Sequence, residues 1–351
     1  MENRENYVKN TLGSKVIHDI YSENGVLLVP FETLITQEHV KKLIKHDITL
    51  PGFTMESINA KRDVKYLEFK KDIDNAVVRA GSLFDDIRET KRIPLSYLRD
   101  DVLPVIHEAV QARQVINLLA SIQVKDDYTY RHNIAVGMIS NLIGTWMSLE
   151  HQDLLQLTTA ALLHDVGKMF IPIQILNKPG RLTDEEYAII KNHTLLGYEI
   201  MKKTIGINHR QALVALQHHE RMNGSGYPFG LTKDKIDLFS RIVSVADIFH
   251  AMTSKRVYSN PLPFNEVLVQ MEKDVFGELD PAITRLFIEK LMNSLIGHSV
   301  MLTDGSEGTI LMVQSHNPTR PLIKVNNKFV DLSKDQSIHI KNINFPDAIA
   351  E

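Results

Sequence analysis

An apolar run that ends in two metal-ligand side chains constrains the fold of this chain more than any other feature. The run covers residues 154–163, and the motif HDVGK (164–168) follows directly. At adjacent helical positions an imidazole and a carboxylate point about 100° apart, so His164 and Asp165 can reach one ion. The two oxygens of the carboxylate can also bridge to a second ion. Lys168 lies one turn further on, on a similar face, which completes a candidate ion site at the end of a hydrophobic helix.

Further ligand-type side chains recur along the chain. Five segments contribute seven of them: His132, His164, Asp165, His193, His218, His219 and Asp247. His132 stands at the start of a predicted helix over residues 134–149, and the tandem histidines end a helix with apolar residues at 212–216. Asp247 lies in an apolar run, where an unpaired charge would be very costly, so we expect it to have a partner. Seven donors exceed the needs of one tetrahedral ion and suit two ions with a water or hydroxide between them.

A predicted helix start indicates which way the side chain of His193 points. Residues 183–186 (TDEE) form a capping box, which predicts a helix that begins there. Four residues are expected to share one face of this helix: Ile189, His193, Leu196 and Ile200. We therefore expect His193 to point inward from an apolar stripe.

A glycine-rich loop follows the tandem histidines. It covers residues 223–230 (NGSGYPFG), and its glycines let the backbone come close to a ligand. Tyr227 offers an aromatic face and a hydroxyl group, and Pro228 stiffens the turn. The loop is therefore a candidate ligand-binding segment rather than only a surface turn.

Composition limits the classes of partner and chemistry. The net charge is −3, with 40 Lys+Arg against 43 Asp+Glu, which argues against binding of nucleic acid polymers or anionic membranes but not of a small phosphate ester. Cysteine is absent, which excludes disulfides, thiolate catalysis and Cys-based metal sites. Any metal is left to histidine, carboxylate and water. We find no signal-peptide core and no apolar stretch of membrane-spanning length, and we expect a soluble, cytoplasmic protein.

Periodicity predicts a mainly α protein with four regions. Residues 1–55 mix short strands with a hairpin turn at Asn24-Gly25 and a short helix from Thr36 or Gln37, as in a small α/β module. Residues 56–125 carry amphipathic helices, a linker or regulatory region that could also pair two copies in a homodimer. Residues 126–296 are helical and hold the candidate site. Residues 297–351 have β character, with turns at 303–305 and 326–327.

The ordered motifs resemble those of the HD-GYP family, a branch of the HD phosphohydrolases. The segments that carry the resemblance are HDVGK (164–168), IPIQILNKPGRLTDEE (171–186), HHERMNGSGYPFGL (218–231) and RIVSVADIFHAMTSKRVYS (241–259). The resemblance as a whole covers residues 126 to about 295, roughly half the chain, which implies that the helical region is an HD-type catalytic domain. Family members hydrolyse cyclic di-GMP to linear pGpG, or on to GMP, so the resemblance implies a cyclic-guanylate-specific phosphodiesterase.

The resemblance also implies a role for each motif residue. One ion would be held by His132, His164, Asp165 and Asp247, and the other by Asp165, His193, His218 and His219. Iron or manganese would be the expected metals, two per chain. Asp165 and Lys168 would be catalytic, with a metal-bridging hydroxide as the nucleophile. Lys168, Gly226, Tyr227, Pro228 and Arg256 would contact the substrate.

Several positions depart from the family pattern. Asn223 and His250 stand where aspartate is usual, and Ser259 where a basic residue is common. Some members bind a third ion through a glutamate whose position is Tyr128 here, which favours two ions and pGpG as the main product. The departures leave two alternatives open: a catalytically weak receptor for cyclic di-GMP, and a phosphodiesterase for another cyclic dinucleotide or nucleotide ester.

Overall fold

The computed structural model describes most of the chain, in two compact units. It covers residues 15–16, 20–22, 27–30, 33–46, 55–56, 58–111, 115, 128–254, 262–275, 277–326, 328–335 and 337–343. Arg256 and Ser259, both singled out from the sequence, lie outside these ranges. The units are Met1–Lys71 and Asp72–Glu351. The four-region boundaries expected from the sequence remain predictions.

The first unit contains short antiparallel pairings and one helix. Its elements are β1 (Lys15–Val16), β2 (Ile20–Tyr21), β3 (Leu27–Val29), α2 (Gln37–Lys45) and β4 (Met55–Glu56). β2 pairs with β3 and β1 with β4. The hydroxyl of Thr36 accepts from the backbone of His39 and caps α2, because the first backbone N–H groups of a helix lack partners within it. The helix start predicted at Thr36 or Gln37 is confirmed, and the β2–β3 pairing agrees with the predicted hairpin, whose turn at Asn24-Gly25 lies outside the described residues.

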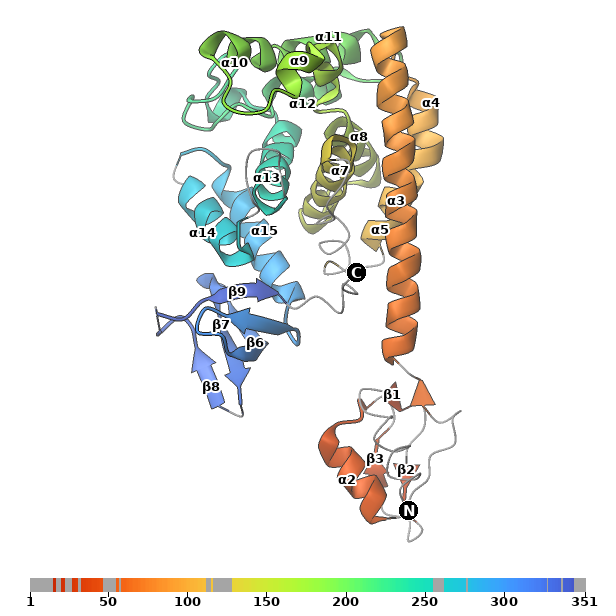
Figure 1. The fold of residues 1–351 in the computed structure, drawn as a ribbon, viewed down its shortest axis with the longest axis vertical. Helices are drawn as coiled ribbons and strands as arrows, with labels where there is room; N and C mark the ends of the chain where they lie inside the picture. The colour runs from red at the N-terminus through yellow and green to blue at the C-terminus, as the bar shows by residue number, and fades with distance from the viewer. Residues whose placement is uncertain are drawn as a thin grey trace. The chain divides into compact units, whose positions relative to one another are not determined.

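A long helix, followed by short ones, precedes the site-bearing domain in the sequence. The elements in this stretch are α3 (Ile58–Thr90), α4 (Leu95–Tyr97), the π-helix η2 (Leu98–Val102) and α5 (Leu103–Gln111). In the second unit the chain from α4 to α5 runs alongside α3 (Figure 1), where Arg79 on α3 donates to the Asp101 carboxylate at 3.3 Å. The amphipathic pattern predicted for this stretch is seen on α3, where five apolar residues spaced by three and four are buried: Ile73, Val77, Ala80, Leu83 and Ile87. Their spacing of three and four residues turns one face of the helix toward its neighbours.

The site-bearing domain is a packed set of helices. Its elements are α7 (Tyr128–Trp146), α8 (His151–Leu162), the 3-10 helix η3 (Val166–Phe170), α9 (Ile173–Leu176), α10 (Asp184–Lys191), α11 (His193–Lys203), α12 (His209–Gln217), the 3-10 helix η4 (Lys233–Lys235), α13 (Leu238–Thr253), α14 (Phe264–Asp274) and α15 (Pro281–Ser294). α7 packs against α5, α8 and α13, and α11 packs against α12 and η3. The predicted mainly α class is confirmed.

A five-stranded antiparallel sheet follows the helices. Its strands are β5 (Ser299–Leu302), β6 (Glu307–Gln314), β7 (Asn317–Val325), β8 (Lys328–Asp331) and β9 (Ile340–Ile343), in the order β8-β7-β6-β5-β9. α14 and α15 pack against it. Gly305 and Asn326, in the predicted turns, have positive φ angles of 84° and 45°, a backbone region that glycine and asparagine tolerate better than other residues. The predicted β-rich extension is confirmed.

The predicted apolar stripe around His193 is wrong in register. The helix is interrupted at Asn192, so α10 ends at Lys191 and α11 begins at His193. The buried face of α11 consists of His193, Thr194, Gly197 and Met201, whereas Ile189 and Leu196 are 36% and 37% exposed. The reason is close packing: a Cβ on Gly167 would come within 1.9 Å of the His193 carbonyl oxygen. Only glycine at position 167 lets η3 approach the start of α11 in this way.

No helix in the described ranges is both long and apolar enough to cross a membrane.

Candidate metal centre and active site

The first two residues of the HDVGK motif, His164 and Asp165, lie in a turn between two helices. α8 ends at Leu162, and η3 begins only at Val166, so the expected helical positions of His164 and Asp165 are replaced by a tight turn. The turn still buries both side chains, which are 0% and 2% exposed. The close approach of η3 to the start of α11, which glycine at position 167 permits, encloses this turn.

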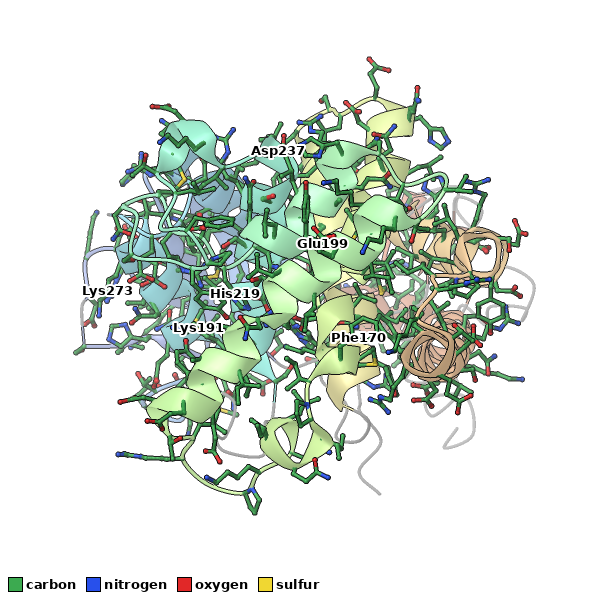
Figure 2. The ribbon with its side chains drawn as sticks, turned by 90° about the horizontal axis from the view of Figure 1, so that it is seen from above. Phe170, Lys191, Glu199, His219, Asp237 and Lys273 are labelled. Atoms are coloured by element: carbon green, nitrogen blue, oxygen red, sulfur yellow. The ribbon has the colours of Figure 1, made fainter. Side chains whose placement is uncertain are left out.

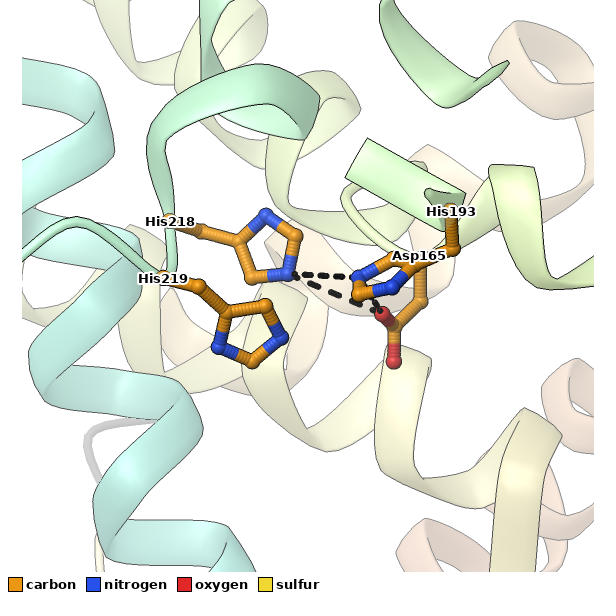
Figure 3. A group of neighbouring side chains, drawn as sticks. All are labelled: Asp165, His193, His218 and His219. Atoms are coloured by element: carbon orange, nitrogen blue, oxygen red, sulfur yellow. Dashed lines mark hydrogen bonds and ion pairs between the residues drawn. The ribbon is translucent and has the colours of Figure 1, made fainter. Parts of the chain in front are cut away.

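The two oxygens of Asp165 face different sets of imidazoles. Oδ1 lies 3.3 Å from Nε2 of His193 and 3.7 Å from Nε2 of His218. Oδ2 lies 3.3 Å from Nε2 of His164 and 3.8 Å from Nε2 of His132. Two groups of candidate ligand atoms, each within 4.8 Å of one another, share this carboxylate: Asp165, His193, His218 and His219 in one, and His132, His164 and Asp165 in the other. Figure 3 shows the first group converging from the turn before η3, the start of α11 and the turn after α12.

Asp247 belongs to the same cluster through His132. It lies on α13, 7% exposed, with Oδ1 3.2 Å from Nε2 of His132. This is the partner that a carboxylate in an apolar run was expected to have. The structure thus brings all seven predicted ligand-type residues together from five separate segments of the chain.

Three of the histidines are oriented by main-chain carbonyls. Nδ1 of His164 lies 2.7 Å from the Ala161 oxygen, and Nδ1 of His193 lies 2.7 Å from the Ile190 oxygen. Nδ1 of His218 lies 3.1 Å from each of two carbonyl oxygens in the last turn of α12. A carbonyl oxygen only accepts, so each Nδ1 carries the proton. Each neutral ring then presents a bare Nε2 to the centre, the form that binds a metal.

The electrostatics favour ionised carboxylates and neutral imidazoles. Burial raises the pKa of Asp165, but Lys168 and His164 outweigh it and hold the pKa well below its usual range. Burial likewise opposes ionisation of Asp247, yet hydrogen bonding and charge from His132 bring its pKa well below normal. Burial lowers the pKa of His193 to about 3. It also lowers the pKa of three further histidines: His132, His218 and His219.

His164 is the exception among these histidines. Burial lowers the pKa of His164, but the negative charge of Asp165, whose Oδ2 lies 3.3 Å from Nε2 of His164, outweighs burial and raises the pKa above its ordinary value. A divalent cation would take over this balancing of negative charge, because metal ligands bind in their deprotonated forms.

Two buried polar atoms without hydrogen-bond partners in the described ranges are a separate indication that the cluster suits cations. Nε2 of His164 and Oδ1 of Asp165 are buried without a hydrogen bond to any described residue, although both lie at ion-pair distances from neighbours. Buried polar atoms are normally satisfied, so such atoms indicate a missing partner. The donor set of imidazole nitrogen and carboxylate oxygen, without thiolate, suits first-row divalent ions.

The glycine-rich loop is fastened to the tandem histidines. A Cβ on Gly226 would lie 2.4 Å from the backbone of His219, so only glycine allows this approach. The N–H of Tyr227 donates to the His219 carbonyl at 3.2 Å, and its ring stacks on His219 at 4.6 Å between centroids. Pro228 follows Tyr227 within the same loop. The aromatic face predicted for ligand binding is therefore turned at least partly onto a candidate metal ligand.

Glu220 is a site residue that the sequence analysis missed. It is 2% exposed, and its two carboxylate oxygens accept from the N–H groups of Phe229 and Leu231, both at 2.8 Å. It thereby ties the far side of the loop to the end of α12. Its position directly after the tandem histidines was the only available signal. Asn223 retains a role in the turn, because its side-chain oxygen accepts from Ser225.

Two further residues form an outer rim that the sequence analysis also missed. Nζ of Lys191 lies 5.1 Å from the ring centroid of Tyr187 and 6.0 Å from that of Tyr227. Figure 2 shows Lys191 beside His219. Tyr187 is 47% exposed, so the rim faces solvent. Lys168 contributes a second cation close to the centre, where its ammonium donates to Oδ2 of Asp165.

Comparison with known proteins adds independent findings. The model of the HD domain family matches residues 113–283. A cyclic di-GMP phosphodiesterase of Pseudomonas aeruginosa is 31% identical over 70% of this chain and 59% of its own length. A cyclic di-GMP phosphodiesterase of Thermotoga maritima is 40% identical over 50% of this chain and 48% of its own length.

A 3′3′-cGAMP-specific phosphodiesterase of Vibrio cholerae is similar at a comparable level. It is 32% identical over 54% of this chain and 40% of its own length. The chain thus spans between 40% and 59% of the length of these three relatives.

Proposed function

We propose that this chain, which belongs to the HD-GYP branch of the HD domain family, is a metal-dependent phosphodiesterase that hydrolyses cyclic di-GMP to linear pGpG. The observation that carries the proposal is the position of Asp165, whose two oxygens each face their own set of imidazole nitrogens. Such an arrangement suits two cations that share one carboxylate, and paired cations are the usual device for in-line displacement at a phosphodiester.

The proposal assigns the cluster to two divalent ions, iron or manganese. His132, His164, Asp165 and Asp247 would hold one ion, and Asp165, His193, His218 and His219 the other. Ions bound there would supply Lewis acidity, which makes a water more acidic and neutralises negative charge on the phosphodiester. The low pKa of Asp165 and the carbonyl-fixed tautomers of His164, His193 and His218 support this assignment.

The protein's own groups would bind and orient the phosphodiester. A water oxygen adds to phosphorus as the bond to the 3′ oxygen breaks, and the 3′ oxygen leaves with a proton, so the product carries a 5′ phosphate. The ammonium of Lys168, 26% exposed beside Asp165, is placed to offset charge that grows on the phosphoryl oxygens. Gly226, Tyr227 and Pro228 would hold the nucleoside side. Arg256 remains a predicted phosphate contact outside the described residues.

Two observations bear on the substrate class. The chain has a net charge of −3, which disfavours a long polyanion, whereas the outer rim carries Lys191 between two tyrosine rings. A small nucleotide with phosphate and a planar base matches such a rim, because bases stack on aromatic rings. The alternative of another cyclic dinucleotide is favoured by the similarity to the cGAMP-specific enzyme, which is as high as that to a cyclic di-GMP enzyme.

The proposal also assigns a role to each of the four regions of the chain. Residues 126–296 would be the catalytic domain, the α/β module 1–55 and the helices of 56–125 the regulatory parts, and residues 297–351 an extension. The N-terminal helices would also be the contact surface of a homodimer. A cytoplasmic location follows from the predicted nature of the substrate, a bacterial signalling nucleotide.

A product time course by chromatography tests the proposal. Protein purified without oxygen and loaded with iron or manganese is given cyclic di-GMP or 3′3′-cGAMP, beside Asp165→Ala as control. We expect pGpG to accumulate with the wild-type chain and not with the variant. Faster turnover of 3′3′-cGAMP would select the alternative substrate. Tight binding of cyclic di-GMP without hydrolysis under every metal would identify a receptor instead of an enzyme.

A further inference from the structure

His132 differs from the three carbonyl-bound histidines in what orients its ring. Its Nδ1 lies 2.9 Å from Nδ1 of His250, and both side chains are buried, 4% and 1% exposed. Two ring nitrogens at this distance require one proton between them. Two bare nitrogens would repel each other, and two protonated nitrogens would clash. The pair must therefore adopt complementary tautomers.

The direction of this hydrogen bond follows from the other edge of His132. Its Nε2 faces the candidate metal centre, 3.2 Å from Asp247 and 3.8 Å from Asp165. When Nε2 binds a cation, the single proton of the neutral ring must lie on Nδ1. His132 then donates to Nδ1 of His250, which must be bare. The proton of His250 moves to its Nε2, which lies 3.0 Å from the hydroxyl oxygen of Ser254 and donates to it.

We propose that His250 is a positioning residue for the ion that His132 holds. It accepts the Nδ1 proton of His132, fixes the ring with Nε2 toward the ion, and is itself oriented by Ser254. The inference rests on the proposed metal centre but concerns a residue outside the ligand set. A single substitution cannot remove the main-chain carbonyls that hold the other histidines, whereas one at position 250 removes the hydrogen bond between His132 and His250.

Because the acceptor at position 250 is a neutral imidazole, it affects how tightly the metal ion at His132 is bound. A carboxylate would accept the same proton in a charge-assisted hydrogen bond, which is about twice as strong, and would make the ligand more basic. Imidazole offers neither charge nor comparable basicity. Position 250 therefore sets how tightly the ion is bound, and the chain as it stands binds it less tightly than its aspartate variant would.

The side-chain geometry supplies a matched series of variants. Aspartate and asparagine carry an oxygen at the same distance along the side chain as Nδ1 of histidine, so both retain an acceptor. Phenylalanine keeps a planar ring at this place but has no acceptor. His107→Phe removes a half-buried histidine on α5 that belongs to neither group of candidate ligands and whose ring lies 5.4 Å from that of His151. It serves as the control for loss of a histidine.

Calorimetric titration of the full chain with Mn²⁺, in the absence of substrate, tests the role of His250. We expect His250→Phe to weaken one of two Mn²⁺ sites by about 10- to 100-fold and leave the other unchanged. His250→Asp should bind Mn²⁺ more tightly than wild type at the same site, and His107→Phe should bind like wild type. Equal affinities in wild type and His250→Phe, or equal weakening of both sites, would overturn the inference.

A second experiment measures the tautomers directly in the wild-type chain. It tests the inference even if His250→Phe does not fold. In the Zn²⁺-loaded wild-type chain, long-range proton–nitrogen correlation spectra should show His132 protonated on Nδ1 and His250 on Nε2. His250→Asn should keep the proton of His132 on Nδ1. A proton on Nδ1 of His250 would contradict the inference. Metal binding as expected but without hydrolysis of any cyclic dinucleotide would refute the proposed function and leave the inference standing.

Discussion

Asp165, two residues after Leu163, and Asp331, directly after Val330, differ in their surroundings. Asp331, at the end of β8 in the C-terminal sheet, accepts from the N–H and hydroxyl of Ser333 at 3.0 and 2.6 Å. Asp304 and Asp335 make the same turn with Ser306 and Ser337. These carboxylates are satisfied within two residues of themselves and near solvent. Asp165 is buried, and its neighbours come from segments far apart in the sequence.

The difference separates a structural carboxylate from a ligand. A locally satisfied carboxylate stabilises the turn that contains it and needs nothing further. A carboxylate buried among imidazoles from several helices costs free energy unless a charge balances it. In the helical domain Lys168 supplies only part of that balance, and Oδ1 of Asp165 is left without a hydrogen bond to any described residue. We therefore expect perturbations of the two regions to have effects of very different size.

The largest difference should appear in catalysis. Asp165→Ala removes the shared carboxylate, so we expect kcat to fall by at least about 10³-fold, as for loss of a group that acts only at the reacting centre. Asp331→Ala should leave kcat within twofold of wild type. Initial rates of cyclic di-GMP hydrolysis at saturating Mn²⁺ provide the comparison. Similar losses in both variants would mean that the rate reports folding and not the metal centre.

Metal binding should stabilise the helical domain through the same side chains. At a free Mn²⁺ concentration 100-fold above its dissociation constant, each ion adds about 2.7 kcal/mol to the free energy of unfolding. Denaturant titrations with Mn²⁺ and with a chelator measure this difference. Asp165→Ala should show none of it, whereas Asp331→Ala should show all of it. A chelator effect that persists in Asp165→Ala would place the ion elsewhere.

The metal-free protein should lose stability in weak acid. Burial lowers the pKa of His193 to about 3, whereas an unfolded histidine titrates near about 6.5, so below that pH the unfolded chain binds a proton that the folded chain refuses. From pH 7.5 to 5 this costs about 2 kcal/mol through His193 alone. His164 opposes the trend, because its raised pKa adds stability below about 6.5 that is lost as the pH rises.

The pH effect has a matched test. Unfolding of the chelator-treated chain at several pH values measures the slope, and His193→Phe should make the slope smaller. The exposed carboxylates of the sheet titrate below this range, so Asp331→Ala should not alter it. Stability that rises as the pH falls from 7.5 to 5 would contradict the assignment of neutral imidazoles.

The smallest expected effect concerns the glycine-rich loop. Glu220→Gln keeps one acceptor oxygen but replaces the other with an amide nitrogen that cannot accept from a backbone N–H. We expect about a 10-fold loss in kcat/KM from a loosened loop, with Mn²⁺ affinity within about twofold of wild type. Glu278→Gln, at an exposed carboxylate paired with Arg221, is the control. An equal loss in metal affinity would mean that Glu220 supports His219 rather than the substrate side.

The sequence predicted the helices, the hairpin, the tail sheet and the full ligand-type set because each depends on local pattern or residue type. Thr183 and Glu186 form the capping box that was expected, and Asp247 found the partner that its apolar surroundings demanded. The break at Asn192 could not be predicted, since it depends on the contact between Gly167 and the backbone of His193. Helical periodicity alone predicted one continuous apolar stripe, whereas tertiary packing interrupts the helix at Asn192.

Tertiary contacts also explain why some site residues could not be predicted from the sequence. Lys191 has ordinary neighbours in the sequence, and Glu220 is marked only by its place after the tandem histidines. Their roles arise from contacts in space with the glycine-rich loop and with the ring of Tyr227. His250 was noticed as a departure from the family pattern, but its partner, His132, lies 118 positions away. Composition and spacing identify which side chains can bind a metal. They do not identify which side chains orient the ligands.

The most direct test of a shared carboxylate is the metal content of three chains. Wild type, Asp247→Ala and Asp165→Ala are loaded with Mn²⁺, freed of excess metal and measured by elemental analysis per mole of folded chain. The account predicts two ions in wild type, one after loss of Asp247, which faces a single ion, and none after loss of Asp165, which faces both. Two ions retained by Asp165→Ala, or three in wild type, would contradict it.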